Sequence, residues 1–191
     1  MLERQHIIDI FEKTGAMLTG HFLLTSGRHS DRYFQCALVL QHPDHCSALC
    51  RELAARFAGD GVESVVGPAM GGIIISYEVA SALSAKSLFT ERDNGKMALR
   101  RGFTISPGER VLVVEDVVTT GGSVKEVIEL VRGLGGNVVG AGVLVDRSGG
   151  GAQLGVRTES LLQIPAVSYS PEQCPLCGRG IPFVKPGSRK V

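Results

Sequence analysis

One segment, residues 110–134, constrains the fold more than any other part of the chain. Val111–Val114 is an uninterrupted apolar run that is too short for a helix, which is typical of a strand buried on both faces of a parallel sheet. Glu115 and Asp116 follow where that strand would end. A loop of small and hydroxylated residues, Thr119–Ser123, comes next, and an amphipathic helical pattern fills the rest of the segment. The segment therefore predicts a strand, an acidic pair, a loop and a helix in succession.

The loop after the acidic pair has the features of a phosphate site. A helix start leaves backbone N–H groups unpaired and carries the positive end of the helix dipole, and glycines let a phosphate come close to the backbone. Glu115 and Asp116 would not bind the same phosphate, because like charges repel, so they would bind sugar hydroxyls or a hard cation such as Mg²⁺. The chain contains no Walker loop, and no dinucleotide fingerprint follows this strand. The alternative is an ordinary strand-to-helix turn capped by Ser or Thr.

Composition excludes several classes of protein. The 191 residues suffice for one domain with a sizeable core, and 43% of them are hydrophobic. A net charge of +1 gives no overall field for nucleic acid or a membrane surface, so we expect neither as a partner. The apolar stretch 65–85 contains one charge, Glu78, but its glycines split it, so we do not expect it to span a membrane. A polar start and five cysteines, an odd count, favour a cytoplasmic protein with reduced thiols.

Strand and helix patterns alternate along the chain and predict an α/β fold. We expect helices at 2–14, 43–57, 72–85 and 124–134, strands at 62–66, 87–92, 111–114 and 138–145, further strands at 101–105 and 161–167, and two short strands around a turn at Ser26-Gly27. Right-handed parallel crossovers would bring 67–72, 115–123 and 146–147 to one edge of the sheet, where ligands bind. The helix at 72–85 is apolar nearly all round, so it is either central or half buried against a second subunit.

Four of the five cysteines fall into two closely spaced pairs. Cys46 and Cys50 lie on the apolar stripe of the helix at 43–57, so we expect them in the core. Cys174-Pro-Leu-Cys177 resembles half a zinc knuckle, but a closed zinc site needs four ligands, and the chain has no second Cys-x-x-Cys or matching His pair. A structural tail is therefore favoured over a metal site, unless two subunits each donate a pair.

The strand, the acidic pair and the Thr-Thr-Gly-Gly-Ser loop resemble the motif with which type I phosphoribosyltransferases bind PRPP, 5-phosphoribosyl-1-pyrophosphate. This resemblance implies an α/β fold with a central, mostly parallel sheet flanked by helices, and a small N-terminal hood at about residues 15–40. It implies one phosphoribosyltransferase domain over residues 1–191, with the tail at 170–191 included. From about residue 15 to residue 150 the likeness is to the members that use orotate, through residues 26–34, the pair Arg92 and Lys96, and Asp146-Arg147.

The resemblance implies an activity and its partners. Such an enzyme is a glycosyltransferase that moves ribose 5-phosphate from PRPP to orotate, giving orotidine 5′-monophosphate and pyrophosphate in de novo pyrimidine (UMP) biosynthesis. Mg²⁺ is the implied cofactor, and a homodimer with shared active sites is the implied assembly. Two alternatives stay open: a purine-type phosphoribosyltransferase, and a non-catalytic regulator that binds PRPP on the same fold.

The resemblance also assigns roles to residues of this chain. Lys96 and Asp116 would be catalytic. The residues implied for orotate are Thr119, Arg147, Tyr33 and Phe34, with the Arg147 guanidinium meeting the orotate carboxylate. The residues implied for PRPP are Arg92, Lys96, Glu115, Asp116, Val117, Val118, Thr119, Thr120, Gly121, Gly122 and Ser123. No side chain is expected to hold a metal on its own; PRPP would carry Mg²⁺, near Asp116.

The placement of Arg147 has two interpretations. Asp146 precedes Arg147 and would hold it toward the ligand, or the two would form a surface ion pair that contributes little. In the second case Arg28 is the next candidate for the orotate carboxylate. The chain also departs from the family pattern at Thr25 and Gly71, where the family often has lysine.

Overall fold

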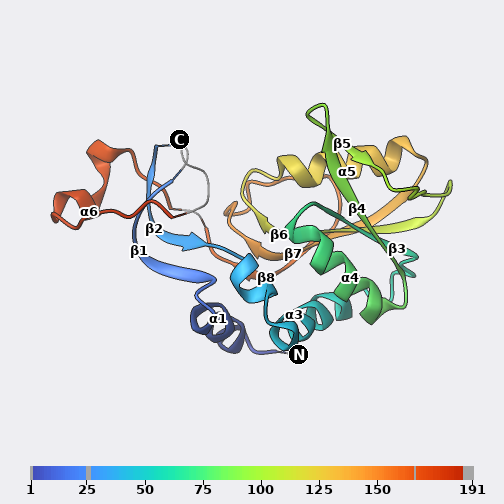
Figure 1. Ribbon diagram of the computed structural model, residues 1–191, viewed down its shortest axis with the longest axis horizontal. Coiled ribbons are helices and arrows are strands. Elements are labelled where there is room, and N and C mark those ends of the chain that lie inside the picture. Colours follow the sequence, from blue (N-terminus) through green and yellow to red (C-terminus); the bar gives the residue numbers. More distant parts are fainter. Residues whose placement is uncertain (1, 25–26, 166, 187–191) are drawn as a thin grey trace.

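A computed structural model describes residues 2–24, 27–165 and 167–186 of the chain (Figure 1). Its helices are α1 (Arg4–Lys13), α2 (Ala37–Leu40), α3 (Pro43–Ala55), α4 (Gly71–Leu83), α5 (Gly122–Gly133) and α6 (Pro175–Gly178), with a 3-10 turn η1 (Pro171–Gln173). Its strands are β1 (Met17–Leu23), β2 (His29–Phe34), β3 (Ser64–Pro68), β4 (Lys86–Asp93), β5 (Lys96–Leu99), β6 (Arg110–Val118), β7 (Asn137–Asp146) and β8 (Thr158–Gln163).

The central sheet has the strand order β5-β4-β3-β6-β7-β8, with β6 in an interior position. Neighbouring strands are parallel except for β4 and β5, which form an antiparallel hairpin at one edge. Because parallel strands need crossover connections, helices cover the sheet on both faces. The predicted mostly parallel sheet flanked by helices is therefore confirmed.

The side chains of β6 alternate between two cores, as the apolar run at Val111–Val114 predicts. Val111 and Val113 pack with the apolar stripe of α5, while Leu112 and Val114 pack in the cluster that holds residues of α1, α3 and α4. All four side chains are fully buried. Figure 1 shows the same layers, with α5 on one side of the sheet and α1, α3 and α4 on the other.

Two glycines of β7 allow α3 to pack closely on the sheet. A Cβ atom on Gly140 would come within 2.8 Å of the Phe57 ring, and one on Gly142 within 3.2 Å of the Leu53 side chain. Cys46 and Cys50 lie in the same layer, 2% and 0% exposed, which confirms that they belong to the core.

Most of the predicted elements are present, but three strands differ. The strand expected at 111–114 continues as β6 to Val118, so Glu115 and Asp116, expected after the strand, lie within it. The expected strand at 101–105 is wrong, because Arg101 and Gly102 both have positive φ angles (61° and 76°) that turn the chain. The strand that pairs with β4 is instead β5, directly after the Asn94-Gly95 turn. The last strand, β8, lies earlier than the expected 161–167 and ends before Pro165, which has no N–H to donate.

Helix α4 is not a central helix. Its N-terminal end and one face expose three large apolar side chains: Met70, 83% exposed, Ile74, 44%, and Tyr77, 67%. The opposite face, including Ile75 and Val79, is fully buried against the sheet. Of the two interpretations of this apolar helix, the structure excludes the central one. Among the described residues, no helix is both long and apolar enough to cross a membrane.

The hood is a hairpin of β1 and β2 that the C-terminal tail holds on both sides (Figure 1). Backbone bridges join Phe22 to Val184 and His29 to Tyr169. The expected pair of short strands is confirmed; the expected turn includes Ser26, which lies outside the described residues.

Candidate active site

The loop between β6 and α5 is shaped by one glycine. Gly121 has a φ of 81°, in the left-handed region that side chains disfavour. A Cβ atom at this position would also lie 2.7 Å from the Leu154 side chain and 3.3 Å from that of Ala152. Both the turn and the close packing therefore require glycine here, and the helix begins at Gly122.

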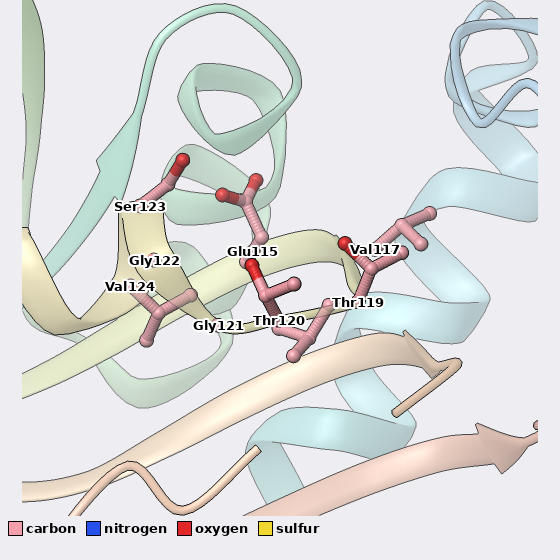
Figure 2. Close-up of a pocket in the computed structure, with 9 residues that line it drawn as sticks. Glu115, Val117, Thr119, Thr120, Gly121, Gly122, Ser123 and Val124 are labelled. Atoms are coloured by element: carbon pink, nitrogen blue, oxygen red, sulfur yellow. The ribbon is translucent and has the colours of Figure 1, made fainter. Parts of the chain in front are cut away.

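The N-terminus of α5 offers an anion site. Within the described chain no side chain caps this helix, and the first backbone bond that closes its turn runs from Lys125 N to Gly121 O at 2.9 Å. The preceding N–H groups are available to a ligand, and the helix dipole favours a negative one. A hollow of about 80 Å³ lies here, lined by Glu115 and residues 117–124 (Figure 2). The predicted phosphate loop thus has the required geometry.

The acidic pair lies beside this hollow. Glu115 is 9% exposed, and its Oε1 accepts a hydrogen bond from Asp116 N at 3.1 Å. Burial, and then the neighbouring charge of Asp116, raises the pKa of Glu115 to about 9. Figure 2 shows the Glu115 carboxyl group and the Ser123 hydroxyl pointing to the same side of the loop. Asp116 Oδ1 likewise accepts a hydrogen bond from Val117 N at 2.8 Å. Two adjacent carboxyl groups, one buried and one half-buried, favour a ligand that brings hydroxyl donors or positive charge.

The glycine-rich turn between β3 and α4 meets the acidic pair. A Cβ atom on Gly71 would lie 2.7 Å from Asp116 Oδ2, so the absent side chain leaves room for this carboxylate. Gly67 and Gly72 approach so closely that a Cβ atom on either would overlap the backbone of the other. The predicted convergence of 67–72 with 115–123 at one sheet edge is confirmed.

Arg147 follows β7 at the same edge and is buried, with 8% of its surface exposed. Its guanidinium stacks over the Phe34 ring, 5.0 Å from the centroid, and Nη2 makes a long 3.5 Å contact to Arg32 O, with the charge of Asp31 nearby. Its Nε has no hydrogen-bond partner among the described residues. Burial lowers the pKa of Arg147 below its ordinary value. A buried, under-partnered guanidinium is a strong site for a carboxylate.

The expected contact between Asp146 and Arg147 is wrong in both of its forms. Oδ1 of Asp146 accepts a hydrogen bond from Ser148 N at 2.7 Å, so this carboxylate oxygen is bonded to the following loop and not to Arg147. Successive residues in an extended chain point to opposite sides, so neighbours in sequence rarely pair. The interpretation as a surface ion pair also fails, because Arg147 is buried.

Cys36, which the sequence did not single out, lies between the two parts of the site. Burial, and then the charges of Asp116 and Glu115, raises the pKa of its thiol, while Arg147 lowers it. The acidic pair and Arg147 therefore lie within electrostatic range of one side chain. No local sequence signal marks Cys36, since its position depends on how the hood meets the sheet.

The other residues expected to bind orotate are placed differently from one another. Phe34 is buried and contacts Arg147, whereas Tyr33 is half-buried and packs near Phe22, with 5.9 Å between ring centroids. Thr119 is exposed at the start of the loop. Arg28, the second candidate for the carboxylate, is bound to Ser168 in the tail through Nε–Oγ (2.9 Å) and Nη2–O (2.6 Å).

The basic hairpin of β4 and β5 packs against α5 and does not line the hollow. Both terminal nitrogens of Arg92 donate to the Glu126 carboxylate, each at 3.0 Å. Lys96 is exposed and borders a separate depression with Glu126 and Glu129. Within one chain, the structure does not bring Lys96 or Arg92 to the residues that line the phosphate hollow.

Comparisons with known proteins agree with this geometry. The phosphoribosyl transferase domain family matches residues 39–154. A curated orotate phosphoribosyltransferase from Pelotomaculum thermopropionicum is 72% identical over 190 residues, 100% of both chains. The crystal structure of orotate phosphoribosyltransferase from Aeropyrum pernix has a TM-score of 0.66 at 31% identity and covers 83% of this chain and 93% of its own.

An adenine phosphoribosyltransferase from Thermoanaerobacter pseudethanolicus also has this fold. Its TM-score is 0.63 at 18% identity, over 70% of this chain and 88% of its own. The similar TM-scores mean that the fold by itself does not separate orotate from adenine as the acceptor. The sequence identity does, because it extends over the hood and the tail as well as the sheet.

Proposed function

The chain belongs to the phosphoribosyltransferase family, among its orotate phosphoribosyltransferases, and from that premise we propose how its residues divide the work. The enzyme transfers ribose 5-phosphate from PRPP to orotate and releases pyrophosphate, a step of pyrimidine biosynthesis. The full-length identity to orotate enzymes argues against both the purine-type enzyme and the non-catalytic regulator.

We propose that the 5-phosphate of PRPP binds the backbone N–H groups at the start of α5. The observation that carries this assignment is the uncapped helix N-terminus behind Gly121 and Ser123, with its hollow of about 80 Å³. Thr119, Thr120 and Ser123 add hydroxyl donors around the same anion. A Cβ atom on Gly122 would meet the Thr120 hydroxyl oxygen no closer than 3.8 Å, so the backbone of this hollow-lining glycine is open to the phosphate.

The acidic pair binds the ribose in this proposal. Glu115 and Asp116 accept hydrogen bonds from the 2- and 3-hydroxyls, while the phosphate binds next to them at the start of α5. The negative charge of Asp116 also favours the oxocarbenium-like transition state, because positive charge develops on the sugar as pyrophosphate leaves. Orientation and charge stabilisation carry the reaction, and no nucleophilic side chain is required.

Mg²⁺ fits the same edge as a cofactor that arrives with PRPP. One or two carboxylates together with substrate oxygens are the usual environment of Mg²⁺. The half-buried Asp116, with Oδ2 facing the space left by Gly71, offers such a carboxylate. The cation would neutralise the departing pyrophosphate, and the raised pKa of Glu115 agrees with a pair that gains from positive charge nearby.

Orotate binds between the hood and the end of β7 in this proposal. Its carboxylate would pair with the under-partnered guanidinium of Arg147, whose other face is covered by Phe34. Uracil lacks this carboxylate and would leave the buried arginine unpaired, so the arginine gives a physical basis for choosing orotate.

We further propose that the active site is completed by a second copy of the chain. Lys96 does not line its own chain's phosphate hollow, and α4 exposes Ile74, Tyr77 and the adjoining Met70. A homodimer that buries this apolar face would let the hairpin of one subunit reach the site of the other. Lys96 would then stabilise the pyrophosphate as it leaves.

The free thiols of the chain agree with a cytoplasmic enzyme.

Mixing two inactive variants tests this shared site. Lys96→Ala should lower kcat by about 10²–10³ with little change in PRPP affinity, because its charge acts mainly in the transition state. Asp116→Asn removes the other half of the site. After subunit exchange, hybrid dimers would contain one site with both residues intact, and some activity should return.

The controls separate a shared site from other outcomes. A mixture of Lys96→Ala with the double variant Lys96→Ala/Asp116→Asn contains no complete site and should stay inactive. No recovery in an exchanged Lys96→Ala and Asp116→Asn mixture would argue for a site built within one chain. A single-turnover rate of Lys96→Ala within about twofold of the parent would remove Lys96 from the mechanism.

A further inference from the structure

The hood and the tail bring together four side chains that commonly bind metals. The ligand atoms of His21, His29, Cys174 and Cys177 all lie within 4.8 Å of one another. The first three residues are 2%, 3% and 4% exposed, and Cys177 is half-buried. In Figure 1 the hairpin of β1 and β2 and helix α6 lie at one end of the molecule, away from α5 and the phosphate loop.

The fold explains why these four residues meet. His29 lies opposite Leu23 in the hairpin, and His21 lies at an irregularity of the pairing between Thr19 and Phe22, where its ring comes into contact with that of His29. The tail pairs with both strands at these points: Tyr169 N donates to His29 O at 2.8 Å, and Val184 N donates to His21 O at 2.8 Å. Between these two anchors the tail runs through the Cys-x-x-Cys segment.

The distances within the cluster are close to those of a tetrahedral metal site. Zinc with two nitrogen and two sulfur ligands places neighbouring ligand atoms about 3.3–3.8 Å apart. Cys174 Sγ lies 3.4 Å from His21 Nε2, and Cys177 Sγ lies 3.2 Å from His29 Nδ1 and 3.8 Å from His21 Nε2. The two ring nitrogens, 2.7 Å apart, would have to separate by about 0.6 Å to admit the ion.

A backbone carbonyl orients His21 as a metal ligand. Nδ1 of His21 lies 2.7 Å from Ile181 O, which can only accept, so this nitrogen carries the proton. The lone pair of Nε2 is therefore directed into the cluster. Metal-binding histidines commonly donate their second N–H in this way. The Phe183 ring, with its centroid 5.0 Å from that of His29 and 5.8 Å from that of His21, lies against both imidazoles.

We propose that His21, His29, Cys174 and Cys177 form a structural zinc site that fastens the C-terminal tail to the hood. Two nitrogen and two sulfur ligands in a tetrahedral arrangement are typical of Zn²⁺, and four protein ligands leave no open position for catalysis. Binding would release the two thiol protons to solvent. The sequence alone disfavoured this site because it contains only half a knuckle; the hairpin supplies the other half from within the same chain.

The proposed zinc has a clear structural role. A two-stranded hairpin is marginally stable by itself, and the tail contains only the short elements η1 and α6. A metal that joins them would stabilise both. Because β2 continues into Phe34, which covers Arg147, the site would also fix the position of the hood over the orotate end of the active site. The proposed site does not depend on the assignment of the substrate.

The metal content of the full-length protein tests the proposal. Protein purified under reducing conditions should contain roughly one zinc per chain by elemental analysis. Removing the zinc, with no PRPP or Mg²⁺ present, should lower the melting temperature by about 5–10 °C, and added Zn²⁺ should restore it. Co²⁺ bound in place of zinc should give the visible absorption of a tetrahedral thiolate site. Reduced protein that takes up neither Zn²⁺ nor Co²⁺ would overturn the site, and stoichiometric iron would overturn the identity of the metal.

Matched variants distinguish metal binding from simple hydrogen bonding among the four side chains. His29→Asn keeps a polar atom near the position of Nδ1 but removes the ligand, so zinc content should fall at least about tenfold. His29→Cys supplies a thiolate instead and should retain zinc. Cys46→Ser alters a buried cysteine outside the cluster and should also retain zinc. Zinc content in His29→Asn equal to that of the parent would contradict the proposal.

Discussion

Two buried glutamates lie close together in the chain, Glu109 directly before β6 and Glu115 in its second half, and their hydrogen-bond partners differ. Glu109 is 6% exposed and accepts hydrogen bonds from the Ser64 hydroxyl and from Ser106 N at 2.9 Å, with Lys86 Nζ at 2.7 Å. Burial raises its pKa, but hydrogen bonds from Lys86, Ser106 and Ser64 outweigh burial and lower the pKa to about 2.

In the second half of β6, Glu115 is 9% exposed, and burial raises its pKa to about 9. Both residues are glutamates with little exposed surface, but Glu109 has hydrogen-bond donors that offset its burial, whereas Glu115 has the neighbouring charge of Asp116 in addition to burial. Glu109, whose carboxylate has hydrogen-bond donors from neighbouring segments, holds these segments together. Glu115, whose carboxyl group lacks such donors, lies toward the carboxyl edge of the sheet, where parallel sheets bind their substrates.

The largest effect should come from removing a charge at the carboxyl edge. Asp116→Asn should lower kcat/KM for PRPP by about 10²–10³, because an amide does not stabilise positive charge on the ribose. The rate of pyrophosphate release with PRPP and orotate as substrates measures this kcat/KM. Glu109→Gln is the matched control and should keep its rate within about twofold. Equal losses in the two variants would remove the distinction between the two regions.

The pH dependence of stability should also separate the two glutamates. Because the folded pKa of Glu115, about 9, lies above its ordinary value of 4.5, the protonated acid favours folding, and this stability is lost as pH rises between these values. Without PRPP and Mg²⁺, the free energy of unfolding should fall by up to about 1.4 kcal/mol per pH unit from pH 6 to 8.5.

Urea denaturation at several pH values checks this slope. Glu115→Gln should flatten it, because the amide does not titrate. Glu109→Gln should keep the parental slope, because the folded pKa of Glu109 is lowered from 4.5 to about 2 and its contribution is lost only as pH falls through that window. An unchanged slope in Glu115→Gln would mean that Glu115 is already ionised in the unliganded protein.

A smaller effect is expected at Arg147, the cationic counterpart of Glu115 at the same edge. Arg147→Ala should raise the KM for orotate by roughly tenfold or more and leave PRPP affinity nearly unchanged, because a bidentate partner of the carboxylate is lost. Arg147→Lys, which keeps the charge without the planar fork, should recover only part of the loss. Steady-state kinetics with orotate as the varied substrate measures both, and parental kinetics for Arg147→Ala would place the carboxylate partner elsewhere.

The smallest effect is expected directly before β6. Glu109→Gln should destabilise the fold by about 1 kcal/mol, because Lys86 is more than half exposed and water can replace the lost carboxylate. For a chain of this size the melting temperature should fall by about 2–4 °C. Thermal unfolding at pH 7 measures it. A melting temperature equal to that of the parent would show that the ion pair adds nothing to stability.

Local sequence determined the strand, loop and helix at 110–134. An apolar run specifies a buried strand, and glycine with small residues specifies the turn, because these preferences act between residues close together in the chain. The phosphate loop could therefore be placed from sequence, whereas the acidic pair, expected after the strand, lies within β6 because pairing with β7 extends the strand to Val118. The strand expected at 101–105 is wrong, because the tight Asn94-Gly95 turn makes β5 the partner of β4, and the chain turns at Arg101.

Tertiary structure alone decided the electrostatics and the composite sites. Glu109 and Glu115 are the same residue type in sequence, and only folding gives one of them Lys86 and Ser64 as partners. Arg147 becomes a buried cation only because Phe34, more than a hundred residues earlier, covers it. Cys174 meets His21 across 153 residues. Contacts at such separations depend on the packing of whole elements, which no local pattern encodes.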